Sequence, residues 1–461
     1  MSGLLTDLYE VRMAASYCGR AMVGPATFSL FVRRLPRQRG FLVAAGLGEC
    51  LRFLQGFRFT AGELDYLAGI GMPEVALRAL RGMRFTGDVW AVPEGRVVFA
   101  SEPLLEVTAP IAEAQLVETM LLNAVTFETA VASKAARCRL AAGQAELIDF
   151  AFRRCHGVDA ALAVARASAI AGFEATSNVE AARRYGLRAA GTMAHSYVEA
   201  FVDERAAFAA FAHDFPAATV FLVDTYDTLS GVANAVRVAR DLDLDGDRLA
   251  VRLDSGDLAE LAVATRRLLD DEGLALARIV ASGGLDEYAI AELVARGAPI
   301  DAYGVGTRMG VSADAPYLDT AYKLVAYGDR PVMKLSTGKV SLPGRKQVYR
   351  GRTPGEDLIA LRDEPAPNGM MPLLVPVIRA GRRVAEPADR HGPPDDVAAA
   401  RRRCAEDLDR LPVAARRLGR PEAPTPGPSP ALRRLATQLA AELAPHAIHQ
   451  PRERHCGAPA G

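Results

Sequence analysis

Between residues 146 and 305 the sequence repeats one pattern: a short apolar run, then roughly ten to sixteen residues with helical spacing. Continuous apolar runs are typical of strands buried on both faces, and strands that alternate with helices form a parallel sheet. About seven such units favour a barrel over an open sheet. The runs occupy 147–152, 173–175, 188–192, 219–223, 249–253, 278–281 and 300–305.

Polar residues follow each run, at the point where the predicted strand ends. In a barrel these ends share one face, and that face carries the active site. Helix N-caps also favour Ser, Thr and Asp, so one cluster alone would mean little. Seven clusters with two arginine sites and a histidine exceed what capping needs, so we predict that they converge on one pocket where His195 does chemistry. The clusters are Arg153 and Arg154; Thr176 and Ser177; Thr192 and His195; Asp224 and Thr225; Arg252, Asp254 and Ser255; Ser282, Gly283 and Gly284; and Gly304, Gly306 and Thr307.

The last two clusters are rich in glycine. Barrels often bind phosphate at the loops after their last strands, through backbone N–H groups. Ser282-Gly283-Gly284 and the loop from Gly304 to Thr307 suit that role. We therefore predict phosphate binding by both loops.

Lysine is rare in this chain. Only five of the 55 cationic residues are lysines, and four of the five lie between 323 and 346. Chance against an arginine-rich background is one interpretation. A need for a compact ammonium group beside phosphates is the other. The remaining lysine, Lys134, lies in a helical pattern at about 110–142, and its role stays open.

Composition excludes several classes of protein. Formal net charge is zero and the pI is about 7.1, which argues against nucleic-acid partners or a polybasic membrane patch. We expect no secretory signal and no membrane span, because no long apolar stretch lacks charges. The six cysteines form no C-x-x-C pair, which disfavours zinc ribbons and disulfides and fits a cytoplasmic protein.

The flanking regions predict a second unit. A helix at about 4–18, with Thr6 as a possible N-cap, precedes helices at about 42–55, 60–70 and 73–81 and short strands at 84–108. The chain turns β-like again after Lys323 and should rejoin this first unit. Two more helices are expected at about 396–417 and 429–443. The tail from about 446 should be disordered; its His446, His449, His455 and Cys456 lack the packed context of a metal site.

At this point the sequence resembles the nicotinate phosphoribosyltransferase family. The matching motifs occur in family order, and as a set they are highly specific. They are L-L-T-D-L-Y-E at 4–10, D-F-A-F-R-R at 149–154, A-T-S-N-V at 175–179, G-T-M-A-H-S at 191–196, V-D-T-Y-D-T at 223–228, R-L-D-S-G-D at 252–257, A-S-G-G-L-D at 281–286, G-V-G-T at 304–307, Y-K-L-V at 322–325 and M-K-L-S at 333–336. The runs at 372–377 and 429–435 extend the likeness towards the C-terminus.

The resemblance implies an α/β fold in which an irregular, incomplete α/β (TIM-like) barrel packs on a discontinuous α/β sandwich. The sandwich would comprise 1–109 with 326–380 returning to it, and the barrel 110–325; a helical extension at 381–445 and the tail at 446–461 would follow. It implies that nicotinate and 5-phosphoribosyl 1-pyrophosphate give nicotinate mononucleotide and pyrophosphate in NAD salvage. ATP hydrolysis would be coupled through phosphorylated His195, and the enzyme would be a homodimer.

The resemblance also suggests roles for single residues. Tyr9, Thr192 and Arg252 would contact nicotinate, whose carboxylate needs an arginine fork or oriented donors. Arg153 or Arg154 and Thr307 would serve the phosphoribosyl end. Asp254 or Asp224 would stabilise positive charge on the ribose, while Mg²⁺ and cationic groups stabilise the leaving pyrophosphate. Four lysines are expected to bind phosphates: Lys323, Lys334, Lys339 and Lys346.

Three alternatives stay open. A related enzyme would use nicotinamide or quinolinate, although Arg252 favours an acid over the neutral amide, and a cation for the second carboxylate of quinolinate is not evident. A barrel aldolase or isomerase for sugar phosphates would want a Schiff-base lysine or a carboxylate base, and no lysine lies between 135 and 322. A binding protein without catalysis would not need His195.

Overall fold

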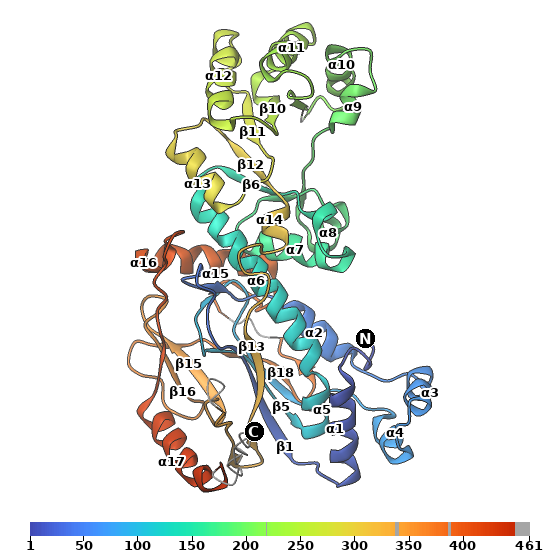
Figure 1. Ribbon diagram of the computed structural model, residues 1–461, viewed down its shortest axis with the longest axis vertical. Helices are drawn as coiled ribbons and strands as arrows, with labels where there is room; N and C mark the ends of the chain where they lie inside the picture. Colours follow the sequence, from blue (N-terminus) through green and yellow to red (C-terminus); the bar gives the residue numbers. More distant parts are fainter. Residues whose placement is uncertain (218, 337–340, 386–388, 448–461) are drawn as a thin grey trace, which may run out of the picture.

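The computed structural model describes residues 1–217, 219–336, 341–385 and 389–447. Figure 1 shows an elongated molecule with a barrel at one end and a mainly antiparallel sandwich at the other. Most of the predicted tail, including His449, His455 and Cys456, lies outside the described residues. Within the described ranges, no helix combines the length and the apolar composition that a membrane span requires.

The barrel is one curled parallel sheet with an open seam. Its spatial order is β8-β7-β6-β12-β11-β10-β9, so the consecutive strands β8 and β9 stand at opposite edges. Neighbours in this order pair in parallel. The predicted fold class, an incomplete α/β barrel with an α/β sandwich, is therefore confirmed. The strands are β6 (Glu146–Asp149), β7 (Ala175–Thr176), β8 (Arg188–Ala189), β9 (Thr219–Leu222), β10 (Leu249–Leu253), β11 (Arg278–Ala281) and β12 (Ala302–Val305).

Helices follow the barrel strands, and aspartates start several of them. The side chains of Asp227, Asp257 and Asp286 accept backbone N–H groups of the first helical turns, which satisfies donors that a helix leaves unpaired. The helices are α7 (Val158–Ile170), α8 (Val179–Tyr185), α9 (His195–Glu199), α10 (Glu204–Asp214), α11 (Thr228–Asp241), α12 (Leu258–Asp271), α13 (Glu287–Ala295) and α14 (Thr307–Gly310).

Some predicted strands are shorter than their apolar runs. β10 and β11 match the predicted bounds, and each pairs with a neighbour on both sides. The runs at 147–152, 188–192, 219–223 and 300–305 were predicted too long, and the run at 173–175 overlaps β7 at a single residue. β8 pairs only with β7, so the chain leaves the sheet after two residues and crosses the seam at 190–194 as a single segment.

The sandwich combines strands from both ends of the chain. β13 pairs with β1 and β18 pairs with β3, so the chain after the barrel does rejoin the first unit. The seven-stranded sheet contains β1 (Pro25–Val32), β3 (Asp88–Ala91), β5 (Pro103–Pro110), β13 (Thr320–Tyr327), β14 (Arg330–Pro331), β18 (Val375–Arg379) and β19 (Arg382–Arg383). A four-stranded sheet contains β15 (Lys346–Arg350), β16 (Asp357–Leu361), β17 (Met371–Pro372) and β20 (Gly427–Pro428), and β2 (Leu42–Val43) pairs with β4 (Val97–Val98).

The N-terminal helices are α1 (Leu8–Gly19), α2 (Leu47–Gly56), α3 (Ala61–Gly69), α4 (Glu74–Leu80) and α5 (Ile111–Leu116). The prediction of Thr6 as N-cap of the first helix is wrong. Asp7 is the N-cap residue, and the Thr6 hydroxyl donates to the Glu10 carboxylate instead. The long predicted helix at 110–142 is divided at Val117 into α5 and α6 (Glu118–Ala142).

Helix α6 joins the two bodies. It runs diagonally from the sandwich into the barrel in Figure 1, and it packs against α2 and β2 at one end and α7 and α13 at the other. Apolar residues along it belong to both hydrophobic cores, since Leu121 lies in the sandwich core and Ala136 in the barrel core. Any displacement of α6 would therefore affect both bodies.

The C-terminal region adds helices at two places. α15 (Val397–Arg410) packs against α7 near the junction of the two bodies, and α17 (Pro430–Ala447) packs against β16 in the sandwich. The single helix predicted at 396–417 is instead broken near Pro412, which follows α15 and precedes α16 (Val413–Arg416), because proline cannot continue a helix.

The only tryptophan of the chain, Trp90, lies on β3 in the sandwich. The guanidinium carbons of Arg362 and Arg379 each lie 4.6 Å from the centroid of its rings. Two cations therefore contact this single indole.

Candidate functional site

Arg252 is the centre of the polar residues at the barrel mouth. Its neighbours Val251 and Leu253 are fully buried among the helices, and because side chains alternate along a strand, Arg252 points to the opposite side of the sheet. Its Nε donates to Ser282 Oγ at 2.8 Å, one Nη to Thr192 Oγ1 at 2.9 Å and the other to Asp254 Oδ1 at 2.7 Å. The structure thus brings together groups that follow three different strands.

Phe150 adds an aromatic ring that the sequence did not single out. The Arg252 guanidinium carbon lies 5.3 Å from the ring centroid. Gly304 makes room for this ring, since a Cβ atom there would come within 2.5 Å of it. Phe150 stands directly after β6, inside the D-F-A-F-R-R motif, so its position beside a strand end was the available signal.

Two aspartates stand beside Arg252. Burial alone would raise the pKa of Asp254, but the Ser282 hydrogen bond and the charges of Arg252 and His195 outweigh it, so this pKa is lowered. Asp254 is therefore ionised near neutral pH. Asp224 Oδ2 accepts hydrogen bonds from the Asp254 backbone N–H and from the Ser255 hydroxyl, while its Oδ1 is buried without a hydrogen-bond partner among the described residues.

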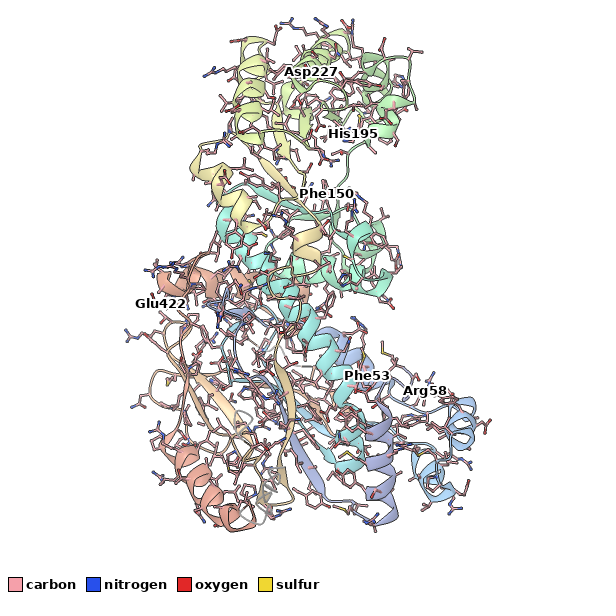
Figure 2. All side chains as sticks on the ribbon, viewed as in Figure 1. Phe53, Arg58, Phe150, His195, Asp227 and Glu422 are labelled. Atoms are coloured by element: carbon pink, nitrogen blue, oxygen red, sulfur yellow. The ribbon has the colours of Figure 1, made fainter. Side chains whose placement is uncertain are left out.

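His195 is the first residue of α9 and is half-buried. Its Nδ1 lies 3.2 Å from Thr225 Oγ1, at the end of β9. Figure 2 shows His195 and Phe150 in the barrel, far from Phe53 in the sandwich. Because β8 and β9 are the edge strands, the segment that carries His195 crosses the open seam of the barrel.

The two predicted phosphate loops follow β11 and β12. Ser282 is buried, and Gly283 has a φ of +98° with its Cα hydrogen directed at the backbone oxygen of Asp254. A Cβ atom at Gly283 would lie 2.1 Å from that oxygen, so only glycine fits. In the second loop Gly306 precedes α14, and Thr307 is exposed at its first position.

The remaining predicted phosphate ligands are dispersed. Arg153 and Arg154 are exposed on the short 3-10 helix η1 (Phe152–Arg154) that follows β6. Lys334 is exposed after β14, and Lys339 lies outside the described residues. Lys346 is only 3% exposed and forms an ion pair with Glu106 at 3.1 Å, so the structure does not support the phosphate-binding prediction for it.

Tyr9 and Lys323 lie in a second group, within the sandwich. Burial and the nearby Glu118 and Glu10 carboxylates raise the pKa of Tyr9. Burial also raises the pKa of Glu118 to about 7, although the Lys323 ammonium opposes this shift. Figure 1 shows α1, which carries Tyr9, at the opposite end of the molecule from α9. One chain therefore does not bring Tyr9 to Arg252.

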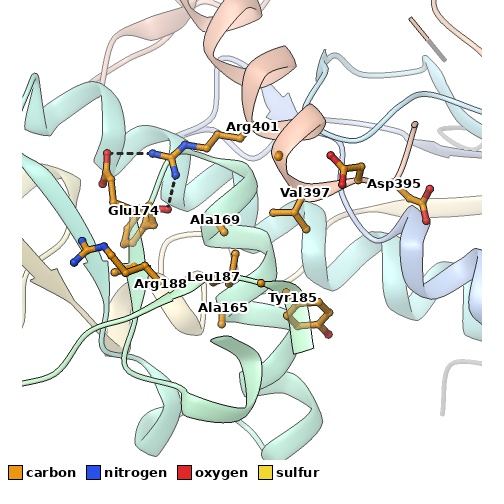
Figure 3. Close-up of a pocket in the computed structure, with 14 residues that line it drawn as sticks. Ala165, Ala169, Glu174, Tyr185, Leu187, Arg188, Asp395, Val397 and Arg401 are labelled. Atoms are coloured by element: carbon orange, nitrogen blue, oxygen red, sulfur yellow. Dashed lines mark hydrogen bonds and ion pairs between the residues drawn. The ribbon is translucent and has the colours of Figure 1, made fainter. Parts of the chain in front are cut away.

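A pocket of about 380 Å³ lies away from the mouth, where α15 meets α7 and the starts of β7 and β8 (Figure 3). At its edge Arg401 forms an ion pair with Glu174 and donates to the Phe173 carbonyl, and Arg139 also pairs with Glu174. These contacts tie the C-terminal extension to the barrel. None of the predicted site residues lines this pocket.

Within the described part of the chain, no group of three or more His, Cys, Asp or Glu residues is arranged to hold a metal ion. Asp224, with its unpartnered buried oxygen, is the acidic group at the mouth with capacity for a further ligand. Mg²⁺ commonly binds through one or two carboxylates together with substrate phosphates, so this single carboxylate fits a metal that arrives with a phosphorylated substrate.

Comparison with known proteins places this chain in one family. Residues 4–126 match the nicotinate phosphoribosyltransferase (NAPRTase) N-terminal domain, and residues 145–336 match the nicotinate phosphoribosyltransferase (NAPRTase) family. The chain therefore belongs to the nicotinate phosphoribosyltransferase family.

Individual relatives agree with this assignment. The chain is 50% identical over 422 residues to nicotinate phosphoribosyltransferase pncB2 of Mycobacterium tuberculosis, covering 91% of this chain and 89% of that protein. It is 45% identical to nicotinate phosphoribosyltransferase of Bacillus subtilis, covering 78% and 76%. The crystal structure of human nicotinic acid phosphoribosyltransferase superimposes with a TM-score of 0.81 and 30% identity, covering 94% of this chain and 99% of that one.

Proposed function

We propose that this chain joins nicotinate to the ribose of 5-phosphoribosyl 1-pyrophosphate, giving nicotinate mononucleotide and pyrophosphate in NAD salvage. The observation that carries the proposal is Arg252, whose guanidinium is held at the barrel mouth by Thr192, Ser282 and Asp254. An arginine fork is the usual protein partner of a planar carboxylate. The names of the relatives support the same reaction.

The reaction requires different protein groups at the ribose and at the leaving pyrophosphate. The pyridine nitrogen of nicotinate attacks the anomeric carbon, the bond from that carbon to pyrophosphate breaks, and the electron pair leaves with pyrophosphate. Positive charge builds on the ribose, where Asp254, which is ionised, would stabilise it; Asp224 is the other candidate for this role. Negative charge builds on pyrophosphate, where the N–H groups of the two glycine-rich loops would receive it.

Mg²⁺ would enter as the partner of the diphosphate and would neutralise part of the charge on the leaving group. Asp224 is the residue that would hold it, because its Oδ1 is buried and has no hydrogen-bond partner among the described residues. Arg153, Arg154, Thr307, Lys323 and Lys334 are proposed to bind phosphate groups of the substrates.

We propose further that ATP phosphorylates His195. With Nδ1 facing the Thr225 hydroxyl, Nε2 is the nitrogen left to attack the γ-phosphorus. The bond from that phosphorus to ADP breaks, and water later hydrolyses the phosphohistidine to release phosphate. The seam position of His195 supports this role, since the open edge gives a second substrate access.

The homodimer is also a proposal, and it rests on the separation of Tyr9 from Arg252. A two-fold dimer would let Tyr9 and Lys323 of one subunit complete the mouth of the other. Mixing the inactive variants Tyr9→Ala and Arg252→Ala tests this. Random exchange should restore about a quarter of wild-type activity if the site is shared between subunits. No recovery from mixed subunits would contradict it.

The direct test of the reaction uses purified protein with Mg²⁺ and 5-phosphoribosyl 1-pyrophosphate. Nicotinate, nicotinamide and quinolinate are supplied separately, each with and without ATP. We expect mononucleotide from nicotinate alone, faster with ATP and accompanied by ADP. His195→Ala should keep the slow ATP-independent rate and lose the stimulation by ATP.

Product from another pyridine would change the substrate and keep the reaction class. The absence of product from all three pyridines would contradict the proposal and favour a sugar-phosphate enzyme or a binding protein.

A further inference from the structure

A buried network of charges lies where α6 enters the barrel. We call it the junction network, and its members are Arg39, Lys134, Arg137, Glu287 and Asp314. Lys134 is at its centre: its Nζ lies 2.6 Å from Glu287 Oε2 and 2.9 Å from Asp314 Oδ1. The side chains of Lys134 and Glu287 are 1% and 0% exposed. The hydrogen bonds that Arg252 forms at the barrel mouth involve neither of them.

The two carboxylates come from the segments that follow the two glycine-rich loops. Glu287 is the first residue of α13 and follows Ser282-Gly283-Gly284 by three residues. Asp314 follows Thr307 by seven residues, just after α14. One ammonium group therefore ties together the elements that carry both loops. A second link between them is the Arg308–Asp286 ion pair at 3.1 Å.

Two arginines hold the outer sides of the same carboxylates. Arg39, from the sandwich, binds both oxygens of Asp314 at 2.8 and 3.0 Å. Arg137 donates to Glu287 at 2.9 Å and also to the Leu418 carbonyl. Planar guanidinium forks suit these outer positions, whereas the compact ammonium of lysine fits between two carboxylates. This explains why the only lysine before residue 323 stands at 134.

The network is rigid for an electrostatic reason. Burial would raise the pKa of Asp314, but the hydrogen bonds and charge of Arg39 and the charge of Lys134 lower it to about 2. Asp314 thus stays ionised throughout the neutral range. Charges attract strongly where water is excluded, and a buried charge without its partner is heavily penalised, so the distances within the network resist change.

We infer that Lys134 is a positioning residue. Through Glu287 and Asp314 it fixes the placement of the two glycine-rich loops relative to each other, and with it the spacing of the N–H groups that receive the phosphates of 5-phosphoribosyl 1-pyrophosphate. The inference rests on the proposed function. Lys134 itself touches no substrate, because its ammonium group is enclosed by the network.

The test compares Lys134→Met with Lys134→Arg and with a matched control. The control is Arg350→Met, since Arg350 is another buried cation that bridges two carboxylates, Asp357 and Asp407, in the sandwich and the C-terminal extension. Steady-state kinetics are measured with each substrate varied in turn, and melting temperatures are recorded for all variants.

Lys134→Met should raise the KM for 5-phosphoribosyl 1-pyrophosphate about tenfold or more, because small displacements of binding groups carry large penalties. The KM for nicotinate should stay within about twofold, and Lys134→Arg, which keeps the charge, should recover part of the loss. Arg350→Met should lower the melting temperature and leave both KM values near those of the wild type.

A folded Lys134→Met enzyme with an unchanged KM for 5-phosphoribosyl 1-pyrophosphate would overturn the inference, as would an equal rise in Arg350→Met. If Lys134→Met does not fold, Asp314→Asn decides by the same criterion.

Failure of the proposed reaction is recognised separately, because wild-type protein would then form no nicotinate mononucleotide. In that case calorimetry with 5-phosphoribosyl 1-pyrophosphate compares wild type and Lys134→Met. Weaker binding by the variant supports the positioning role. Equal binding, or no binding by either protein, overturns it.

Discussion

The barrel mouth and the junction network use the same residue types in opposite ways. At the mouth Arg252 and Asp254 keep 11% and 29% of their side-chain surface exposed, and Asp224 Oδ1 has no hydrogen-bond partner among the described residues. In the junction network no side chain is more than 10% exposed in the ion pairs Arg39–Asp314, Lys134–Glu287 and Lys134–Asp314. Polar atoms that can still bind a ligand therefore lie at the barrel mouth, whereas the ion pairs that anchor the glycine-rich loops are buried.

The largest expected effect is at the mouth. Arg252→Ala removes the guanidinium that three partners hold, and kcat/KM for nicotinate should fall by about 10²–10³-fold, as for other preorganised charged donors. Arg252→Lys should recover little, because an ammonium group cannot form the fork. Thermal melting serves as the control and should change little. If the free energy of unfolding fell by as much as the activation free energy rose, the barrel mouth would not differ from the junction network.

The next effect is at the junction network and concerns folding. Arg137→Met leaves a buried carboxylate with one cation fewer, and the free energy of unfolding should fall by about 3 kcal/mol. Equilibrium unfolding in urea measures it. The variant should lose less kcat/KM for nicotinate than Arg252→Ala does. Unchanged stability would show that the network is not the closed structural unit that its burial indicates.

The smallest expected effect concerns Glu118, which lies in the second group of residues, beside Tyr9. Burial raises the pKa of Glu118 from 4.5 to about 7, so the folded protein holds a proton there that the unfolded chain releases between these values. Wild-type stability should therefore fall relative to Glu118→Gln as pH rises from about 4.5 to 7, by at most about 1.4 kcal/mol for each pH unit. Unfolding curves at several pH values test it, and parallel pH profiles of the two proteins would contradict it.

The sequence predicts the barrel mouth well because each residue of the mouth lies on a strand or shortly after one. Strands β10 and β11 had the predicted bounds, and Arg252 donates to Thr192, Asp254 and Ser282. Strand ends of one parallel sheet meet at one edge, so the polar residues that follow β8, β9, β10 and β11 lie together at the mouth. Phe150 was missed because an aromatic residue beside a strand end is usually read as part of the core.

The junction network could not be predicted from the positions of strand ends in the sequence. Its residues lie at 39, 134, 137, 287 and 314, and no periodicity relates them; only the path of α6 brings them together. Lys134 was noticed for its rarity, but its partners were not. The open seam was also hidden, because β8 and β9 are adjacent in the sequence and only the spatial order of the strands separates them.

The placement of the only tryptophan has a spectroscopic consequence. Trp90 lies in the sandwich in contact with Arg362 and Arg379, and no tryptophan lies in the barrel. Indole emission therefore reports the environment of one body alone, whereas far-ultraviolet circular dichroism follows the helices of both. Recorded together on one sample, the two signals separate melting of the sandwich from melting of the barrel without any label.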